Sequence, residues 1–290
     1  MERNTDTIPA TLASTRFRMR DYLPRMFRRA CLSALFGMTA CSLAMADSPP
    51  PLSEEQVRAA EFIEGLSIPN PGELFAAFGK SGKPPDWSTF FRKQAPAAHF
   101  TRPVIALNLG IRIADGFLAA EAQDRQQVKN VSTEIKLLAK SLGLEQEFMV
   151  RNNSISDFAD SRRWNALVEE IEALRGELAA TMEGQRDSGL VMLMSLGCWL
   201  RSVDVASGQL AADYTPEGAG ILCDPAVGEF FAARLEALPA KVRAIPAVAE
   251  IQRRLPTLSL AKGTPPSKEA ATSLHRLASN MVSLIAAPEK

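Results

Sequence analysis

The sequence predicts an all-α fold, a multi-helix bundle in which two apolar helices are buried and amphipathic helices wrap around them. Two stretches, 103–122 and 189–207, are apolar on nearly every side, which is typical of helices buried among other helices. Other stretches repeat apolar residues at intervals of three and four, as amphipathic helices do. No stretch shows the sustained alternation that predicts a strand. With 290 residues, 46% of them hydrophobic, the chain has enough apolar material for a sizeable core.

Residues 1–46 have the features of an export signal. Arg25, Arg28 and Arg29 precede the uncharged run 30–46, and Ala44-Met45-Ala46 supplies the small-x-small pattern that a signal peptidase recognises. The run is slightly short for a bilayer span, and a proline-rich segment follows it rather than a basic flank. We therefore expect cleavage after Ala46 and a periplasmic or secreted mature protein.

Two alternatives concern the same segment. The first is an uncleaved N-terminal anchor, and the second is lipidation at Cys41, because Met38-Thr39-Ala40-Cys41 is similar to a degenerate lipobox. The second would make the protein a membrane-anchored lipoprotein. Residues 1–18 are surplus to a signal, so Met19 and Met26 are alternative starts of translation.

The expected mature chain has four parts. A proline-rich tether spans 47–52, a helical bundle domain 53–255, a linker 256–266, and a C-terminal helix at 267–286 packs on the bundle. Without residues 1–46 the chain holds 26 basic and 30 acidic residues. This mildly acidic balance gives no electrostatic reason to expect nucleic acid or anionic lipid as a partner.

In the first half of the mature chain we expect a helix over 53–65, which begins with a capping box, and a short helix over 71–78. The segment 79–98 reads as a loop whose aromatic residues fold onto the bundle as a packed flap, with a ligand lid as the alternative. The central apolar helix should begin at Thr101 and run to about Gln123.

The middle of the chain carries the clearest periodic patterns. A one-sided apolar seam predicts a helix over 128–142 that ends at Gly143. A short helical piece over 145–150 should lead into a turn at 151–154, and a strong amphipathic helix should follow over 161–182.

The second apolar helix should come next and loosen at 208–220. We expect a helix over 224–238, then a helical segment with a kink at Pro246, and a last helix capped by Ser267. The apolar run 190–200 is too short for a membrane span, so we expect no transmembrane helix in the mature chain.

The stretches IALNLGIRIADGFLAA, NNSISDFADSRRWNAL and LMSLGCWL resemble an uncharacterised family of exported all-helical bacterial proteins. The resemblance covers about Pro69–Arg201. It implies export and a helical fold, and it implies no activity, substrate or catalytic residue.

The candidate site is a polar stripe on the first apolar helix. Asn108, Arg112 and Asp115 stand at i, i+4 and i+7, so they share one face of that helix. A buried arginine needs a carboxylate, and Asp115 lies one turn away from Arg112. Two readings stay open: an internal ion pair that Asn108 completes, or a pocket in which Arg112 grips an anion and Asp115 is an acid or base.

The two apolar helices echo each other. Leu109-Gly110 is followed by Arg112 and Asp115, and Leu196-Gly197 is followed by Arg201 and Asp204, so both helices carry Arg-x-x-Asp. A glycine inside a helix costs about 1 kcal/mol relative to alanine. Gly110, Gly116 and Gly197 therefore predict places where two helices approach closely.

Other chemistry has little support in the sequence. The two histidines, His99 and His275, have no cysteine or carboxylate at ligand spacing, so we expect no metal site. Motifs of serine hydrolases, of nucleotide sites and of dinucleotide sites are absent, and we expect no cofactor. Cys198 and Cys223 either form a disulfide after export or stay unpaired.

These observations favour a non-enzymatic envelope protein, a helical scaffold or interaction module that binds an envelope protein or a small ligand. The alternative is an enzyme or small-ligand binder with a site around Asn108, Arg112 and Asp115. A dry, closed stripe favours the first class, and a stripe that opens into a concave pocket favours the second. The sequence does not indicate an oligomeric state.

Overall fold

The computed structural model describes residues 70–80, 84–93, 100–222, 226–258 and 264–287, and those residues are all-α, with no strand among them. The expected signal segment, the tether, the helix at 53–65, His99 and Cys223 lie outside the described residues. The compact unit that begins at Leu52 is the one described below.

Two long apolar helices form the centre of this unit, as predicted. Helix α3 spans Arg102–Glu121 and helix α7 spans Ser188–Ala212. Their backbones cross closely: a Cβ built on Gly110 would lie 1.9 Å from the carbonyl oxygen of Met194, and one built on Gly197 would lie 2.1 Å from that of Leu107. The prediction of close approach is therefore confirmed at these two glycines.

At Gly116 the same prediction is wrong. A Cβ there would meet its nearest atom, Cδ1 of Ile171, at 3.7 Å, which is ordinary van der Waals contact.

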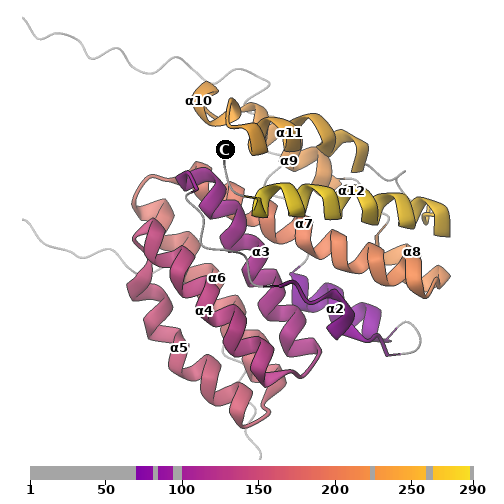
Figure 1. The fold of residues 1–290 in the computed structure, drawn as a ribbon, viewed down its shortest axis with the longest axis horizontal. Helices are drawn as coiled ribbons and strands as arrows, with labels where there is room; N and C mark the ends of the chain where they lie inside the picture. Colours follow the sequence, from indigo (N-terminus) through magenta and orange to yellow (C-terminus); the bar gives the residue numbers. More distant parts are fainter. Residues whose placement is uncertain (1–69, 81–83, 94–99, 223–225, 259–263, 288–290) are drawn as a thin grey trace, which may run out of the picture. The chain divides into compact units, whose positions relative to one another are not determined.

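The amphipathic helices α4 (Arg125–Leu142), α5 (Glu145–Asp160) and α6 (Trp164–Gly184) follow α3, and Figure 1 shows them side by side next to it. Asp124 caps α4 by accepting from the amide of Gln127, and Gly143 ends it in the left-handed conformation. The buried faces of the three helices join one core with α3.

Helix α5 corrects the expected turn at 151–154, because the helix runs through it. Phe148, Ile155 and Ala159 recur at helical spacing and are buried. Arg151, in the expected turn, bonds Glu170 and Glu177 on α6. These tertiary contacts outweigh the weak helix propensity of the asparagine and serine residues there.

Helix α2 (Pro71–Lys80) and the short helix η1 (Trp87–Phe90) precede α3. Trp87 is buried with its ring centroid 5.5 Å from that of Phe75, so this part of the expected flap does pack on the helices. The remainder of the flap, at 81–83 and 94–99, lies outside the described residues.

The later helices depart from expectation in two places. The chain does not loosen at Gly208, since α7 continues to Ala212 and α8 (Pro216–Ile221) follows. Pro246 begins helix α11 (Pro246–Arg254) instead of kinking a longer helix, after α9 (Ala226–Glu236) and α10 (Ala240–Arg243). Proline fits the first turn of a helix, where its missing N–H is not needed.

The last helix, α12 (Lys268–Ala286), follows the short helix η2 (Leu255–Leu258). The hydroxyl of Ser267 accepts from the amide of Ala270, which confirms the predicted cap. Helix α12 packs mainly along α7 and also contacts α3 and α11; Figure 1 shows it in yellow beside α7.

Helices α3 and α7 are long and apolar enough to cross a membrane by length and composition. However, 89% of the apolar window of α3 and 72% of that of α7 are buried against other parts of the protein. In this fold both therefore serve as core helices.

Candidate functional site

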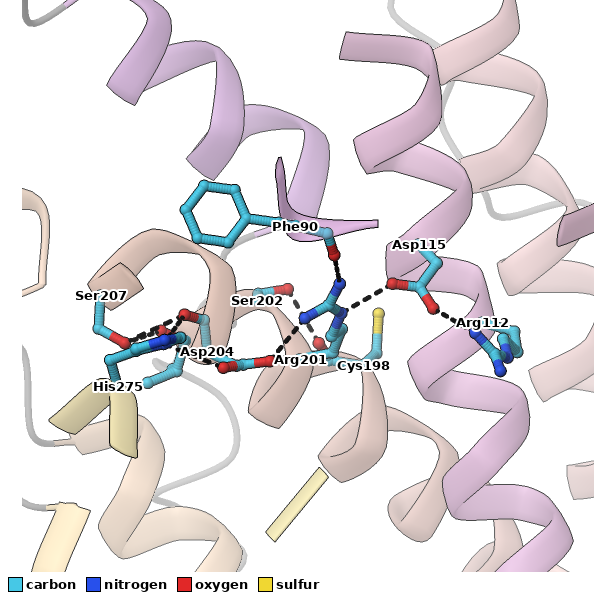
Figure 2. Close-up of polar contacts among 10 residues, drawn as sticks. Phe90, Arg112, Asp115, Cys198, Arg201, Ser202, Asp204, Ser207 and His275 are labelled. Atoms are coloured by element: carbon cyan, nitrogen blue, oxygen red, sulfur yellow. Dashed lines mark hydrogen bonds and ion pairs between the residues drawn. The ribbon is translucent and has the colours of Figure 1, made fainter. Parts of the chain in front are cut away.

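Asp115 lies at the centre of the polar stripe, and both of its carboxylate oxygens are bonded. Oδ2 accepts from Nη1 of Arg112 at 2.9 Å, and Oδ1 accepts from Nε of Arg201 at 2.7 Å (Figure 2). The side chains of all three residues are at most 4% exposed. The first bond lies within α3, and the second joins α3 to α7.

The contacts extend in both directions from this carboxylate. Nη2 of Arg112 lies 2.8 Å from Oε2 of Glu134 on α4. Nη1 of Arg201 lies 2.5 Å from Oδ2 of Asp204, and Nδ1 of His275 on α12 lies 3.1 Å from Oδ1 of Asp204. We call this alternating series of acidic and basic groups the ion cluster, and it consists of Glu134, Arg112, Asp115, Arg201, Asp204 and His275.

The cluster spans four helices because the two Arg-x-x-Asp patterns meet. Within each pattern the arginine and the aspartate are one turn apart, so each pair forms inside its own helix. The close crossing at Gly110 and Gly197 brings the helices together, and Arg201 then also reaches Asp115. The repeated pattern in the sequence therefore corresponds to one shared cluster.

The last residue of η1, Phe90, also contacts the cluster. The carbonyl oxygen of Phe90 accepts from Nη2 of Arg201, so all three nitrogens of that guanidinium are bonded (Figure 2). Burial acts to lower the pKa of Arg201, but Asp115 and Asp204 outweigh it and raise that pKa. Arg201 is thus a permanent cation held by two carboxylates.

Arg92 is a further cation near the cluster. Its Nη1 is buried and has no hydrogen-bond partner among the described residues. Burial lowers the pKa of Arg92; the charges of Asp115 and Asp204 oppose this, and those of Arg112 and Arg201 add to it. Arg92 can therefore take a further acceptor, which the bonded guanidinium of Arg201 cannot.

Asn108 does not belong to the cluster, which corrects that part of the expected stripe. Its Nδ2 donates to the carbonyl oxygen of Val104 at 3.0 Å and to that of Ile285 at 2.9 Å. The amide therefore joins α3 to the end of α12. Asn108 lies on the same face of α3 as Arg112, but its side chain is too short to reach the network one turn away.

Cys198 on α7 is buried and has no disulfide partner among the described residues. Burial raises its pKa to about 12, so the reactive thiolate is scarce at neutral pH. Because Cys223 lies outside the described residues, the disulfide between the two stays a prediction.

Among the described residues, no group of three or more His, Cys, Asp or Glu side chains is arranged to hold a metal ion. Two surface pockets lined by described residues lie away from the cluster. One is at the start of α4 and includes Asp124 and Lys129, and the other lies between α5 and α6 and includes Glu147 and Thr181.

Sequence reasoning missed Glu134, His275 and Arg92 as neighbours of the stripe, and it noted Arg201 and Asp204 only as a repeat. Two signals were present. Glu134 stands between Val131 and Ile135 on the buried face of its helix, where a charge needs a partner. The second Arg-x-x-Asp lies in a helix that holds no other charged residue.

Comparison with protein-family models, with curated proteins and with solved structures finds no match to this chain. The functional reading therefore depends on the geometry described above and on the sequence.

Proposed function

We propose that the protein is an exported, non-enzymatic helical module of the cell envelope that acts as a scaffold or interaction partner. The observation that carries this proposal is that both carboxylate oxygens of Asp115 already accept hydrogen bonds from arginines. A general acid or base must exchange a proton with substrate. Both oxygens of Asp115 accept from arginines, and its side chain is only 3% exposed. The ion cluster is therefore best explained as an internal network that fixes the register of four helices.

Export is supported by residues 25–46, where a basic region, an apolar run and a small-x-small site follow one another. The proposal places the mature helical unit outside the cytoplasm, with lipidation at Cys41 as the alternative to release.

An interaction role is supported by apolar side chains that the described fold leaves in solvent. Leu137 on α4 is 57% exposed, and Val150 and Met149 on α5 are 70% and 43% exposed. Exposed apolar area that forms a patch marks a contact surface, whereas single exposed side chains are common. The outer sides of α4 and α5 are therefore the first surface to test for a partner.

The test uses the mature protein as bait in envelope extracts, with Val150→Glu as one variant and Leu137→Glu as another. A protein that binds the wild type at stoichiometric levels, and is lost with either variant, supports the proposal. The control variant is Ala233→Glu, at an exposed position on α9. Turnover of a substrate by the mature protein that Asp115→Asn abolishes without loss of stability would contradict the proposal.

A second candidate function, binding of a small anion, is favoured by Arg92 alone. An anionic carboxylate or phosphate would satisfy its buried Nη1. Calorimetric titration with inorganic phosphate and with acetate tests this, with Arg92→Gln as the variant and the exposed Arg102→Gln as the control. Equal heats for all three proteins would eliminate this candidate.

A further inference from the structure

His275 lies at the solvent end of the ion cluster and is its only titratable member near neutral pH. Its side chain is 36% exposed, whereas that of Asp204 is 5% exposed. Water can therefore reach the imidazole, while the carboxylate on which it acts is enclosed. Asp204 is held from its other oxygen by Arg201, which in turn bonds Asp115.

Two oxygens of Asp204 lie next to the ring. Nδ1 is hydrogen-bonded to the carbonyl oxygen of Asp204 at 2.9 Å and lies 3.1 Å from its Oδ1 (Figure 2). Oδ1 is buried and has no hydrogen bond among the described residues, so its contact with the ring is one of charge. Because both neighbours are acceptors, Nδ1 carries a proton in either charge state, and the proton that titrates is on Nε2. Loss of that proton leaves the contact in place but removes the positive charge facing Asp204.

The position of the ring is also built into α7. A Cβ on Gly208 would lie 2.9 Å from Cε1 of His275 and 2.6 Å from Cε1 of Phe90. Because Gly208 has no Cβ, one ring from α12 and one from η1 can pack against it. The imidazole of His275 therefore packs directly against the backbone of α7.

We propose that the protonation state of His275 controls how stably the C-terminal helix α12 packs on α7. A protonated imidazole forms a charge pair with Asp204 and stabilises this packing, and deprotonation removes the charge pair and destabilises it. This inference does not depend on the proposed function. It makes the packing of α12 dependent on pH. The other ion pairs of the cluster contain arginines, which do not lose their charge near neutral pH.

The surroundings determine the sign of the effect. The side-chain hydrogen bond to Asp204 raises the pKa of His275 and burial lowers it; Asp204's carbonyl and charge add to the rise, and the charge of Arg201 opposes it. The net effect raises the pKa of His275 above the ordinary value of a histidine. The two charged groups that act on the ring, Asp204 and Arg201, both lie on α7. The stabilisation from the charge pair is therefore fully present below the unfolded-state pKa of His275 and is lost as pH rises through its folded-state pKa.

The first test is a histidine titration by NMR. The chain has two histidines, so His99→Gln assigns both imidazole signals. We expect His275 to titrate above 6.5 in the folded protein, and Asp204→Asn to shift its midpoint downward. A midpoint at or below that of the unfolded chain would overturn the proposal.

The second test measures hydrogen exchange of the α12 amides between about pH 5 and pH 9, corrected for intrinsic exchange. Protection of α12 relative to α4 should fall as pH rises in the wild type and in His99→Gln. In His275→Gln, which retains a hydrogen-bonding side chain and leaves Asp204 in place, that dependence should disappear. The same pH dependence in His275→Gln would overturn the proposal, and this variant keeps it testable if Asp204→Asn does not fold.

Discussion

At the scale of single residues, Asp115 joins the two central helices of the described fold. Its carboxylate bonds two arginines from different helices, Arg112 and Arg201. Both arginines have a second carboxylate, Glu134 for one and Asp204 for the other. The ion pairs of the cluster are therefore connected to one another and are not isolated pairs. Removal of Asp115 affects the ion pairs of both arginines.

Replacement of Asp115 by alanine should lower the free energy of unfolding by about 3–5 kcal/mol, because two buried guanidiniums lose an acceptor. Denaturant melts of the mature protein measure this. The matched control is Asp187→Ala, whose partner Arg102 is 50% exposed. A surface pair of that kind contributes at most about 1 kcal/mol.

Wild-type stability of Asp115→Ala would contradict the structural role of the stripe and make the cluster the first place to search for a ligand. The structure also changes the expected rescue. Replacing Arg112 and Asp115 together by leucine removes the contact between Arg112 and Glu134 as well. Recovery should therefore be only partial.

At the scale of helices, the crossing of α3 and α7 positions the cluster. The two backbones are so close that neither Gly110 nor Gly197 has space for a Cβ. A larger residue at either position would separate the helices and move Arg201 away from Asp115. The ion cluster thus depends on two residues that carry no charge.

Replacement of Gly110 by alanine should destabilise the protein by about 3 kcal/mol or more, because its Cβ would overlap a backbone oxygen that cannot move alone. Gly116→Ala, six residues further on in the same helix, is the control. Its Cβ has room at 3.7 Å from Ile171, so helix propensity should give a gain of about 0.5–1 kcal/mol.

Thermal or chemical melts of both variants test the crossing. If Gly110→Ala and Gly116→Ala have the same stability, the close approach of α3 and α7 is not a feature of the protein in solution.

At the scale of the whole molecule, the described unit is one core built around two apolar helices, with contacts from α2 through α12. The N-terminal segment that the sequence predicts to be removed lies outside it. If export is correct, the mature protein keeps every element described here.

Intact mass of the protein recovered from the cell envelope should correspond to a chain that begins at Asp47, because charge, apolar length and small residues agree at Ala46. Cleavage before Cys41 with a lipid adduct would instead establish the lipoprotein alternative. A mass that includes residues 26–46 would show that the segment is retained as an anchor.

The sequence by itself determined the all-α class and most helix positions, because apolar periodicity and capping residues are local signals. It also indicated the Arg112–Asp115 pair, whose members are one turn apart in α3. It did not predict the continuity of α5 through 151–154, where Arg151 gains its partners from α6.

Only the tertiary structure decided which distant groups complete the stripe. Arg201 is 86 positions from Asp115 and donates to it, while Asn108, on the same helix, bonds the end of α12 instead. The physical reason is that a buried charge takes whatever partner the packing brings within about 3 Å. That packing is set by the crossing at Gly110 and Gly197. The sequence marks each glycine as a place of close approach, but it does not show that these two helices cross each other there.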